Sequence, residues 1–301
     1  MSLQGIIQAG ARLAVGTGAA VAIDSGIGLL KRGVSEPKIV RIERQPGAPN
    51  RTIVLFHGYN GHGEALVRIL GPTLSAYGTV VGFEPTGGRY DNEDVLDAAD
   101  EALVGCSSDG VVVYGESFGG MTAADWLRRR PSLLLDAWVL NASPSGLGDA
   151  LGAGSWAKVF DWLHGGPLST ALLRTGQRYG MRNLPPIEAD ADGEAASLAY
   201  RLALQITAPM IFGQVSYIRN FTSPCPGEFA GRVRQARYIH APAPRGHDGR
   251  IRVAAASPVW QSALPGTGFQ DIVVDSWEQE THTPTAERPS GLLSQLIAVM
   301  Q

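Results

Sequence analysis

Cysteine is scarce in this chain, which has two, Cys106 and Cys225, among 301 residues. Two thiols cannot build the disulfide framework of a small secreted domain, and they favour a reducing compartment or a pair of buried thiols. Positive charge is not in excess either, because 25 Lys and Arg stand against 28 Asp and Glu, a formal net charge of −3. This charge gives no electrostatic basis for binding nucleic acid, and nucleic acid is not expected as a partner.

Metal and nucleotide signatures are also missing. No group of cysteines and histidines has the spacing of a zinc site. The acidic run at 188–193 has Ala199 where a calcium loop needs its closing carboxylate. The glycine-rich segments at 86–88 and 115–120 lack the lysine of a phosphate-binding loop. We therefore expect neither a metal ion nor a cofactor.

Long apolar runs are absent as well. The uncharged stretch from Leu13 to Ile23 is shorter than the about 20 residues that span a bilayer as a helix. It allows an N-terminal helix that packs on the protein, a helix that contacts a membrane surface through residues 1–30, or a signal peptide cleaved near Ala22. Arg12 is the only positive charge ahead of the run, and the run is rich in glycine, which favours the packed helix. We expect a cytoplasmic protein, with export or membrane association as the alternatives.

What the sequence does contain is a regular alternation of two patterns. Short apolar runs at 52–56, 79–83, 111–113 and 137–140 indicate buried strands. Segments with helical spacing of apolar residues separate them, and a half-buried strand at 38–43 precedes them. Strand and helix in alternation predict an α/β protein, with a mostly parallel, doubly wound sheet covered by helices on both faces.

The alternation breaks after Ser143, and strand character returns at 237–241 and 271–275, before a last helix at 289–299. The residues between have helical patterns and little strand character. We interpret 146–232 as a helical cap inserted into a core formed by 38–145 and 233–301, with 1–37 as an N-terminal helical segment.

The segment Gly115-Glu116-Ser117-Phe118-Gly119 lies between an apolar strand and a helical pattern. A G-x-S-x-G turn in this setting is a nucleophile elbow. The serine backbone is held in a strained conformation, so the residues two before and two after it must lack side chains. The following helix directs its free N–H groups and the positive end of its dipole toward that point. Ser117 is the predicted nucleophile.

A serine hydroxyl needs a base, and the base needs an acid that orients it. On a sheet of this kind the expected chain order is serine, acid, histidine. Asp248 follows the strand at 237–241, and His282 follows the strand at 271–275, so the predicted acid is Asp248 and the predicted base His282.

Alternatives exist for both positions. Asp248 precedes a glycine and could serve only to form a turn. Asp275, Glu278 and Glu280 are rival acids, although all lie on the segment that carries His282. The other histidines fit less well, since we place His57 in a structural turn, His240 at a strand end in the core and His164 in the cap.

A negative oxygen on the reaction intermediate needs two backbone donors. The N–H of Phe118, directly after the serine, is one candidate. The N–H of Tyr59 is the other, because the turn His57-Gly58-Tyr59 follows a buried strand at the same edge of the sheet. A bare turn at this place is the alternative.

These elements together resemble the α/β-hydrolase superfamily, over about 38–145 and 233–301. The histidine loop and final helix, residues 282–289, resemble the superfamily too. Its members often have Gly-x-x-Asp directly after the strand that precedes the acid, whereas here residues 241–245 intervene before Asp248.

The resemblance implies a serine hydrolase that cleaves a carboxylic ester through an acyl-enzyme, with a small ester or acyl compound as its partner. A thioesterase would use the same catalytic groups and is the alternative activity. C–C hydrolase and perhydrolase activities fit less well. A protein that binds a ligand without turning it over is the alternative that is not an enzyme. The predicted cap has eight apolar residues that could contact an acyl chain, and the alternative is that they simply pack against the core. They are Trp156, Phe160, Trp162, Leu168, Leu172, Met210, Ile211 and Phe212.

Overall fold

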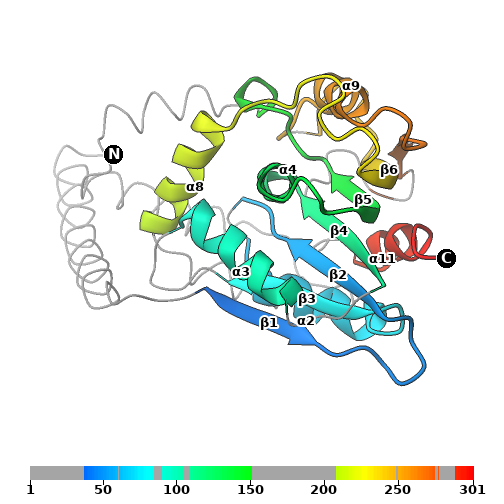
Figure 1. Ribbon diagram of the computed structural model, residues 1–301. Coiled ribbons are helices and arrows are strands. Elements are labelled where there is room, and N and C mark those ends of the chain that lie inside the picture. The colour runs from blue at the N-terminus through cyan, green and yellow to red at the C-terminus, as the bar shows by residue number, and fades with distance from the viewer. Residues whose placement is uncertain are drawn as a thin grey trace, which may run out of the picture.

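The structure is a computed structural model that describes residues 37–59, 61–84, 90–104, 109–150, 208–248, 250–274, 277 and 289–301. It has one seven-stranded sheet of order β1-β3-β2-β4-β5-β6-β7 (Figure 1). The strands are β1 (Lys38–Ile42), β2 (Arg51–Phe56), β3 (Thr79–Glu84), β4 (Gly110–Glu116), β5 (Leu135–Asn141), β6 (Val233–His240) and β7 (Gln270–Val273). The helices are α2 (Gly63–Leu74), α3 (Asn92–Val104), α4 (Phe118–Arg129), α8 (Ala208–Asn220), α9 (Val253–Ala263) and α11 (Pro289–Ile297), with a 3-10 turn, η1, at Leu147–Asp149.

The strands are parallel except β1, which pairs antiparallel with β3 at one edge. The predicted α/β class and mostly parallel sheet are therefore confirmed. Residues of β2 to β5 are nearly all buried, because helices cover both faces. The edge strand β1 is only partly buried, which agrees with its alternating pattern.

Alternate residues of each strand enter two separate cores. One core lies between the sheet and helices α3, α4 and α9, and includes Phe56, Val113 and Trp138. The other lies on the opposite face under α2 and α11, and includes Leu55 and Tyr114 (Figure 1). The sheet is thus doubly wound, as the sequence predicts.

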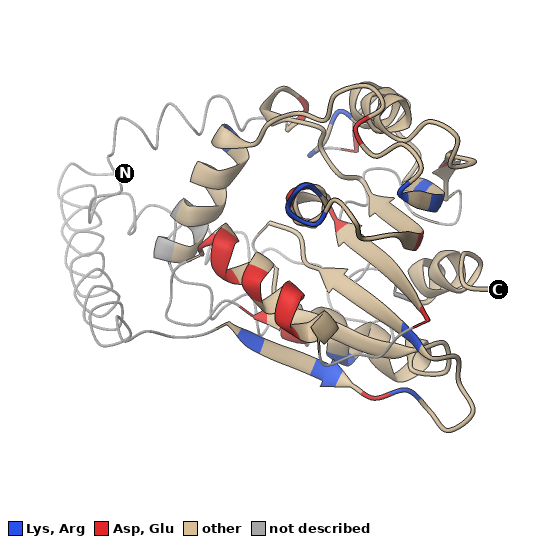
Figure 2. Cartoon of the chain, viewed as in Figure 1, with Lys and Arg blue, Asp and Glu red and all other residues tan. Residues whose placement is uncertain are grey.

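Ion pairs connect α3 and α4 at the surface. Acidic residues gather along α3, and Figure 2 shows them as a red stripe. Arg129 and Arg130 at the end of α4 pair with Asp97 and Asp100 of α3, the latter pair at 3.1 Å. Arg129 and Arg130 therefore join two helices, and they also lie where positive charge is favourable, at the C-terminal end of α4.

Most of the predicted cap, residues 151–207, and the predicted N-terminal segment up to residue 36 lie outside the described residues. Of the cap's eight apolar residues, Met210 alone has a described side chain, and it packs in the core with α4. No helix within the described ranges is long and apolar enough to cross a membrane. Cys225 is exposed directly before the turn at 226–232, so the expectation of a pair of buried thiols is wrong.

Candidate active site

The turn between β4 and α4 has the geometry that the glycine pattern predicts. Ser117 has φ 48° and ψ −115°, and it is one of two non-glycine residues with positive φ in the described part of the chain. A side chain in this region of backbone conformation is strained. The N–H of Ser117 donates to the carbonyl oxygen of Asn141 at 2.7 Å, which holds the strained residue against the next strand.

The flanking glycines are required by close backbone contacts. A Cβ atom on Gly115 would lie 2.6 Å from the Cα of Gly120, and one on Gly119 would lie 2.2 Å from the carbonyl oxygen of Phe56. The first turn of α4 thus approaches both β4 and the end of β2. Gly120, which the motif does not include, is equally constrained, because its Cβ would lie 2.2 Å from Oγ of Ser143.

Strand register brings the candidate residues to one edge of the sheet. Phe56 pairs with Gly115, Glu116 with Asn141, and Asn141 with Ile239, so β2, β4, β5 and β6 end together. The serine turn, the turn at 57–61 and the loop that carries Asp248 follow three of these strands. The carboxyl edge of a parallel sheet is where ligands bind in such folds.

The turn after β2 is a compact hydrogen-bonded loop. The carbonyl oxygen of Gly58 accepts a bond from Gly61 N–H at 2.9 Å and from Nδ1 of His57 at 2.8 Å. A Cβ on Gly58 would lie 3.3 Å from the carbonyl oxygen of Glu116, so the turn lies directly beside the residue that precedes the serine. The structure therefore brings the segment containing Tyr59 next to the segment containing Phe118.

His57 and Tyr59 are both neutral groups at this edge. Because a carbonyl can only accept, Nδ1 of His57 carries a proton, and burial lowers the pKa of the ring. This is the structural role that the sequence predicts for His57. Burial raises the pKa of the Tyr59 phenol to about 12, although the residue as a whole is 39% exposed.

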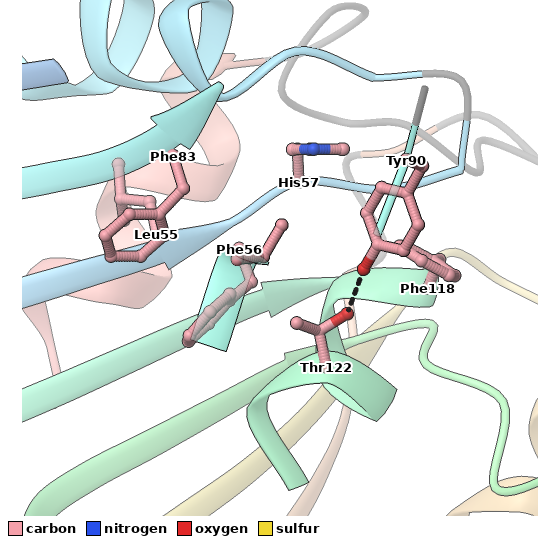
Figure 3. Close-up of a pocket in the computed structure, with 8 residues that line it drawn as sticks. Leu55, Phe56, His57, Phe83, Tyr90, Phe118 and Thr122 are labelled. Atoms are coloured by element: carbon pink, nitrogen blue, oxygen red, sulfur yellow. Dashed lines mark hydrogen bonds between the residues drawn. The ribbon is translucent and has the colours of Figure 1, made fainter. Parts of the chain in front are cut away.

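A small cavity lies behind the His57 turn and the first turn of α4 (Figure 3). It offers about 10 Å³ to the centre of a water-sized sphere, roughly one water molecule. Its lining is mainly apolar, with His57, Tyr90 and Thr122 as polar members. The hydroxyl oxygens of Tyr90 and Thr122 lie 3.3 Å apart. The cavity is too small for a substrate.

Asp248 is fully buried in the loop between β6 and α9. Its Oδ1 accepts bonds from the N–H groups of Arg250, at 2.9 Å, and Ile251, at 2.7 Å. The carboxylate therefore forms the turn, which was one of the two interpretations of this residue. An antiparallel bridge between Ala150 and Ile251 ties the loop to the segment after β5.

His282 and the rival acids Asp275, Glu278 and Glu280 lie outside the described residues. The described chain on either side is well anchored. Trp277 is buried, and its ring packs against Gly291 of α11. Its backbone N–H donates to the carbonyl oxygen of Val274 at 3.0 Å. The predicted base thus belongs to the connection between β7 and α11.

His240 is the last residue of β6 and is buried, as the sequence predicts. Its Nδ1 faces the carbonyl oxygen of Ala241 at 2.6 Å, and its Nε2 faces Oδ1 of Asp271 at 3.2 Å. Both nitrogens face acceptors, an arrangement that favours the protonated ring. Burial, the largest single effect, lowers the pKa of His240, but the bonds to Asp271 and Ala241 and the charges of Asp271 and Asp248 together outweigh it and raise the pKa. A histidine held in this way is a poor candidate for the base.

Asp271 is a partner that sequence reasoning missed. Its Oδ2 accepts a bond from the hydroxyl of Ser257 on α9 at 2.6 Å, so the carboxylate joins β6, β7 and α9. No local pattern marks this pairing, because the three residues come from separate elements. Among the described residues, no group of three or more His, Cys, Asp or Glu is placed to hold a metal ion.

Comparison with known proteins finds similarity in structure alone. No family model and no curated protein sequence matches the chain. It resembles the esterase RhEst1 from Rhodococcus sp. ECU1013, with a TM-score of 0.60 and 15% identity over 88% of this chain and 94% of that one. It also resembles an esterase from Exiguobacterium antarcticum, with a TM-score of 0.61 and 10% identity over 88% and 95%.

A third similar structure is the type II thioesterase BorB from the borrelidin biosynthetic cluster. Its TM-score is 0.58 and its identity 16%, over 87% of this chain and 97% of that one. All three similarities extend over nearly the whole of the solved chains. At identities this low, the similarities show that this chain shares its fold with the three proteins.

Proposed function

We propose that this chain, which has the α/β-hydrolase fold, is a serine hydrolase that cleaves a carboxylic ester through an acyl-enzyme. The observation that carries the proposal is the backbone of Ser117, strained to φ 48° between a buried strand and a helix. A protein gains no stability from such a residue, because Gly or a relaxed backbone would serve a plain turn better. Strain of this kind clusters at active sites.

The proposed reaction has two steps. Oγ of Ser117 attacks the ester carbonyl carbon while its proton passes to a neutral His282, and the alcohol then leaves with that proton. In the second step water attacks the acyl group, His282 takes a proton from the water and returns it to Ser117, and the carboxylic acid leaves. Asp248 orients His282 and stabilises its charged form. The chemistry needs neither a metal ion nor a cofactor.

The charge on the reacting oxygen is stabilised by the N–H groups of Tyr59 and Phe118. The proposal is supported by the contact between Gly58 and Glu116 and by the close approach of Gly119 to the end of β2, which put the two turns side by side. The neutral state of His57 also supports it, because that ring supports the turn without adding a charge. Loss of one such donor costs about 10² to 10³ in rate in other enzymes.

A thioester is the second candidate substrate, since the attack, the base and the donors would be the same. The similarity to a type II thioesterase favours including it in the first experiments. A binding module without turnover remains the alternative from another class, and a reactive-serine probe separates it from both enzymes.

The first test is hydrolysis of p-nitrophenyl esters from acetyl to palmitoyl by the full chain. We expect turnover by wild type, a loss of at least about a thousandfold in Ser117→Ala, and no loss in the control Ser132→Ala, which alters an exposed serine after α4. Equal turnover by Ser117→Ala and wild type would contradict the proposal.

If wild type hydrolyses no ester, an acyl thioester series with thiol detection follows. Labelling of Ser117 by a fluorophosphonate, located by mass spectrometry, then decides whether the serine is activated at all. Failure to label folded wild type would leave the binding module as the remaining interpretation.

A further inference from the structure

The side chain of Phe118, directly after the proposed nucleophile, is enclosed by aromatic rings from α8 and from the segment that precedes α3. Its ring meets that of Tyr90 at 5.2 Å and that of Tyr217 at 5.2 Å, both edge-on. Phe221 extends the group, 6.0 Å from Tyr217. Tyr217 lies on α8 and Phe118 on α4, so this contact fixes α8 against the helix that begins at the serine.

Hydrogen bonds hold the same two helices together. The hydroxyl of Tyr217 donates to Oδ2 of Asp125 on α4 at 2.6 Å. Burial, and the charge of Asp125, raise the pKa of Tyr217 well above its ordinary value, so the phenol stays protonated and remains a donor. The bond orients the ring that contacts Phe118.

Asp125 is itself fixed by a second network. Its Oδ1 accepts a bond from Nη1 of Arg128 at 2.7 Å, and Arg128 binds Glu228 through Nε at 2.6 Å and Nη2 at 3.1 Å. The guanidinium also lies 5.1 Å from the centre of the Phe221 ring. The acceptor of the Tyr217 bond therefore has little freedom to move.

The approach of α8 is as close as the backbone allows. A Cβ on Gly213 of α8 would lie 2.3 Å from the carbonyl oxygen of Tyr90. Tyr90 is held in turn by its hydroxyl, which donates to Oδ1 of Asn92 at 2.8 Å. Both rings that enclose Phe118 are thus anchored by hydrogen bonds at their far ends.

We propose that Tyr217 is a positioning residue, which holds Phe118 so that its backbone N–H stays directed at the reacting oxygen. The inference rests on the proposed function. The N–H of Phe118 belongs to the peptide that follows ψ of Ser117, so any relaxation of the strained serine would turn this donor away. The hydrogen bond from the N–H of Ser117 to Asn141 holds the strained residue where β4 ends. The packing of the Phe118 ring against Tyr217 holds it where α4 begins.

The test compares Tyr217→Ala, Tyr217→Phe and a control pair, Tyr77→Ala and Tyr77→Phe. Tyr77 is partly buried too, but it packs on the opposite face of the sheet. The readouts are kcat, KM and the rate constant for fluorophosphonate labelling of Ser117, which needs the same donors and no known substrate. Thermal unfolding of each variant measures stability separately.

We expect Tyr217→Ala to lower kcat and the labelling rate about 10- to 100-fold at nearly unchanged KM, because small misplacements of a reacting group cost this much. Tyr217→Phe keeps the ring and should restore most of the rate. The Tyr77 variants should lose stability without a change in kcat. If Tyr217→Ala does not fold, Tyr217→Leu takes its place.

Unchanged kcat and labelling in Tyr217→Ala would overturn the positioning role while leaving the serine mechanism in place. The same holds if the rate loss disappears on cooling the variant well below its unfolding midpoint, because a structural defect alone would then explain it. Wild type that is not labelled at Ser117 would overturn the proposed function and the positioning role with it.

Discussion

Ser117 and Asn141 are joined where two neighbouring strands end, by a 2.7 Å hydrogen bond from the N–H of the first to the carbonyl oxygen of the second. Directly after Asn141, Ala142 also has positive φ, 43°, and its N–H donates to the carbonyl oxygen of Ile239 at 2.9 Å. Two strained residues thus follow adjacent parallel strands, each bonded to the next strand along. The sheet edge itself stabilises a backbone that neither residue would adopt alone.

The strain at Ser117 predicts an order of stability among its variants. Glycine adopts this backbone without a steric penalty, whereas alanine keeps the Cβ atom and the strain. We expect Ser117→Gly to be more stable than Ser117→Ala by about 1 kcal/mol or more, measured by urea denaturation. Both should be inactive. Equal stability of the two would show that the turn relaxes when the hydroxyl is removed, against the strained geometry described above.

Two substitutions of Asp248 separate its role in the turn from its proposed role in catalysis. Asparagine keeps an oxygen for the N–H groups of Arg250 and Ile251, so Asp248→Asn should fold with nearly wild-type stability. Alanine leaves these two donors unpaired and should cost about 1 to 3 kcal/mol for each that is buried.

The kinetic expectation for Asp248 follows from charge. Without a carboxylate the proposed base loses its orienting partner, so kcat of Asp248→Asn should fall by about 10² to 10⁴. The comparison needs kcat on the ester that wild type prefers and urea denaturation of both variants. An Asp248→Asn enzyme with full kcat would assign the acid to another residue and leave Asp248 as a turn former.

The pair of His240 and Asp271 predicts how stability depends on pH. The pKa of His240 is raised from its ordinary 6.5, so its contribution is complete below 6.5 and is lost as pH rises through the folded pKa. The pKa of Asp271 is lowered from 3.8, against burial, by His240 and Ser257, so its contribution is complete above 3.8 and is lost as pH falls through the folded pKa.

The pair should therefore stabilise the protein most between the two ordinary values, 3.8 and 6.5. In wild type the free energy of unfolding should decline as pH rises above 6.5. Asp271→Asn should have a flatter profile over that range, and Ser257→Ala, which removes a neutral donor, should keep most of the decline. Parallel profiles of wild type and Asp271→Asn from urea denaturation would contradict the ion pair.

Local signals made much of the fold predictable. Runs of β-branched and apolar residues located β2 to β5 to within about three residues, because a strand buried on both faces has few polar positions. The order of strands and the antiparallel pairing of β1 depend on contacts between residues far apart in sequence, which no local pattern encodes.

The serine turn was predictable for a similar reason. Ser117 has positive φ, and close backbone contacts leave no room for a side chain at positions 115 and 119. The two glycines are therefore a local signal that the sequence shows directly. His57 and His240 were placed correctly from their positions at strand ends. Asp271 was not identified, because its partners come from β6 and α9 and meet only in the folded chain.

The sequence by itself determined the class of fold, the strained serine and the edge of the sheet where chemistry is expected, since glycine positions and apolar periodicity act over a few residues. The tertiary structure decided which groups surround that edge. It enclosed Phe118 between Tyr90 and Tyr217, buried Asp248 and paired His240 with Asp271. The contacts of Phe118 and His240 join residues from separate elements, and Asp248 is buried only by the segments that fold around its loop. These relations therefore exist only once packing has brought the elements together and excluded water from between them.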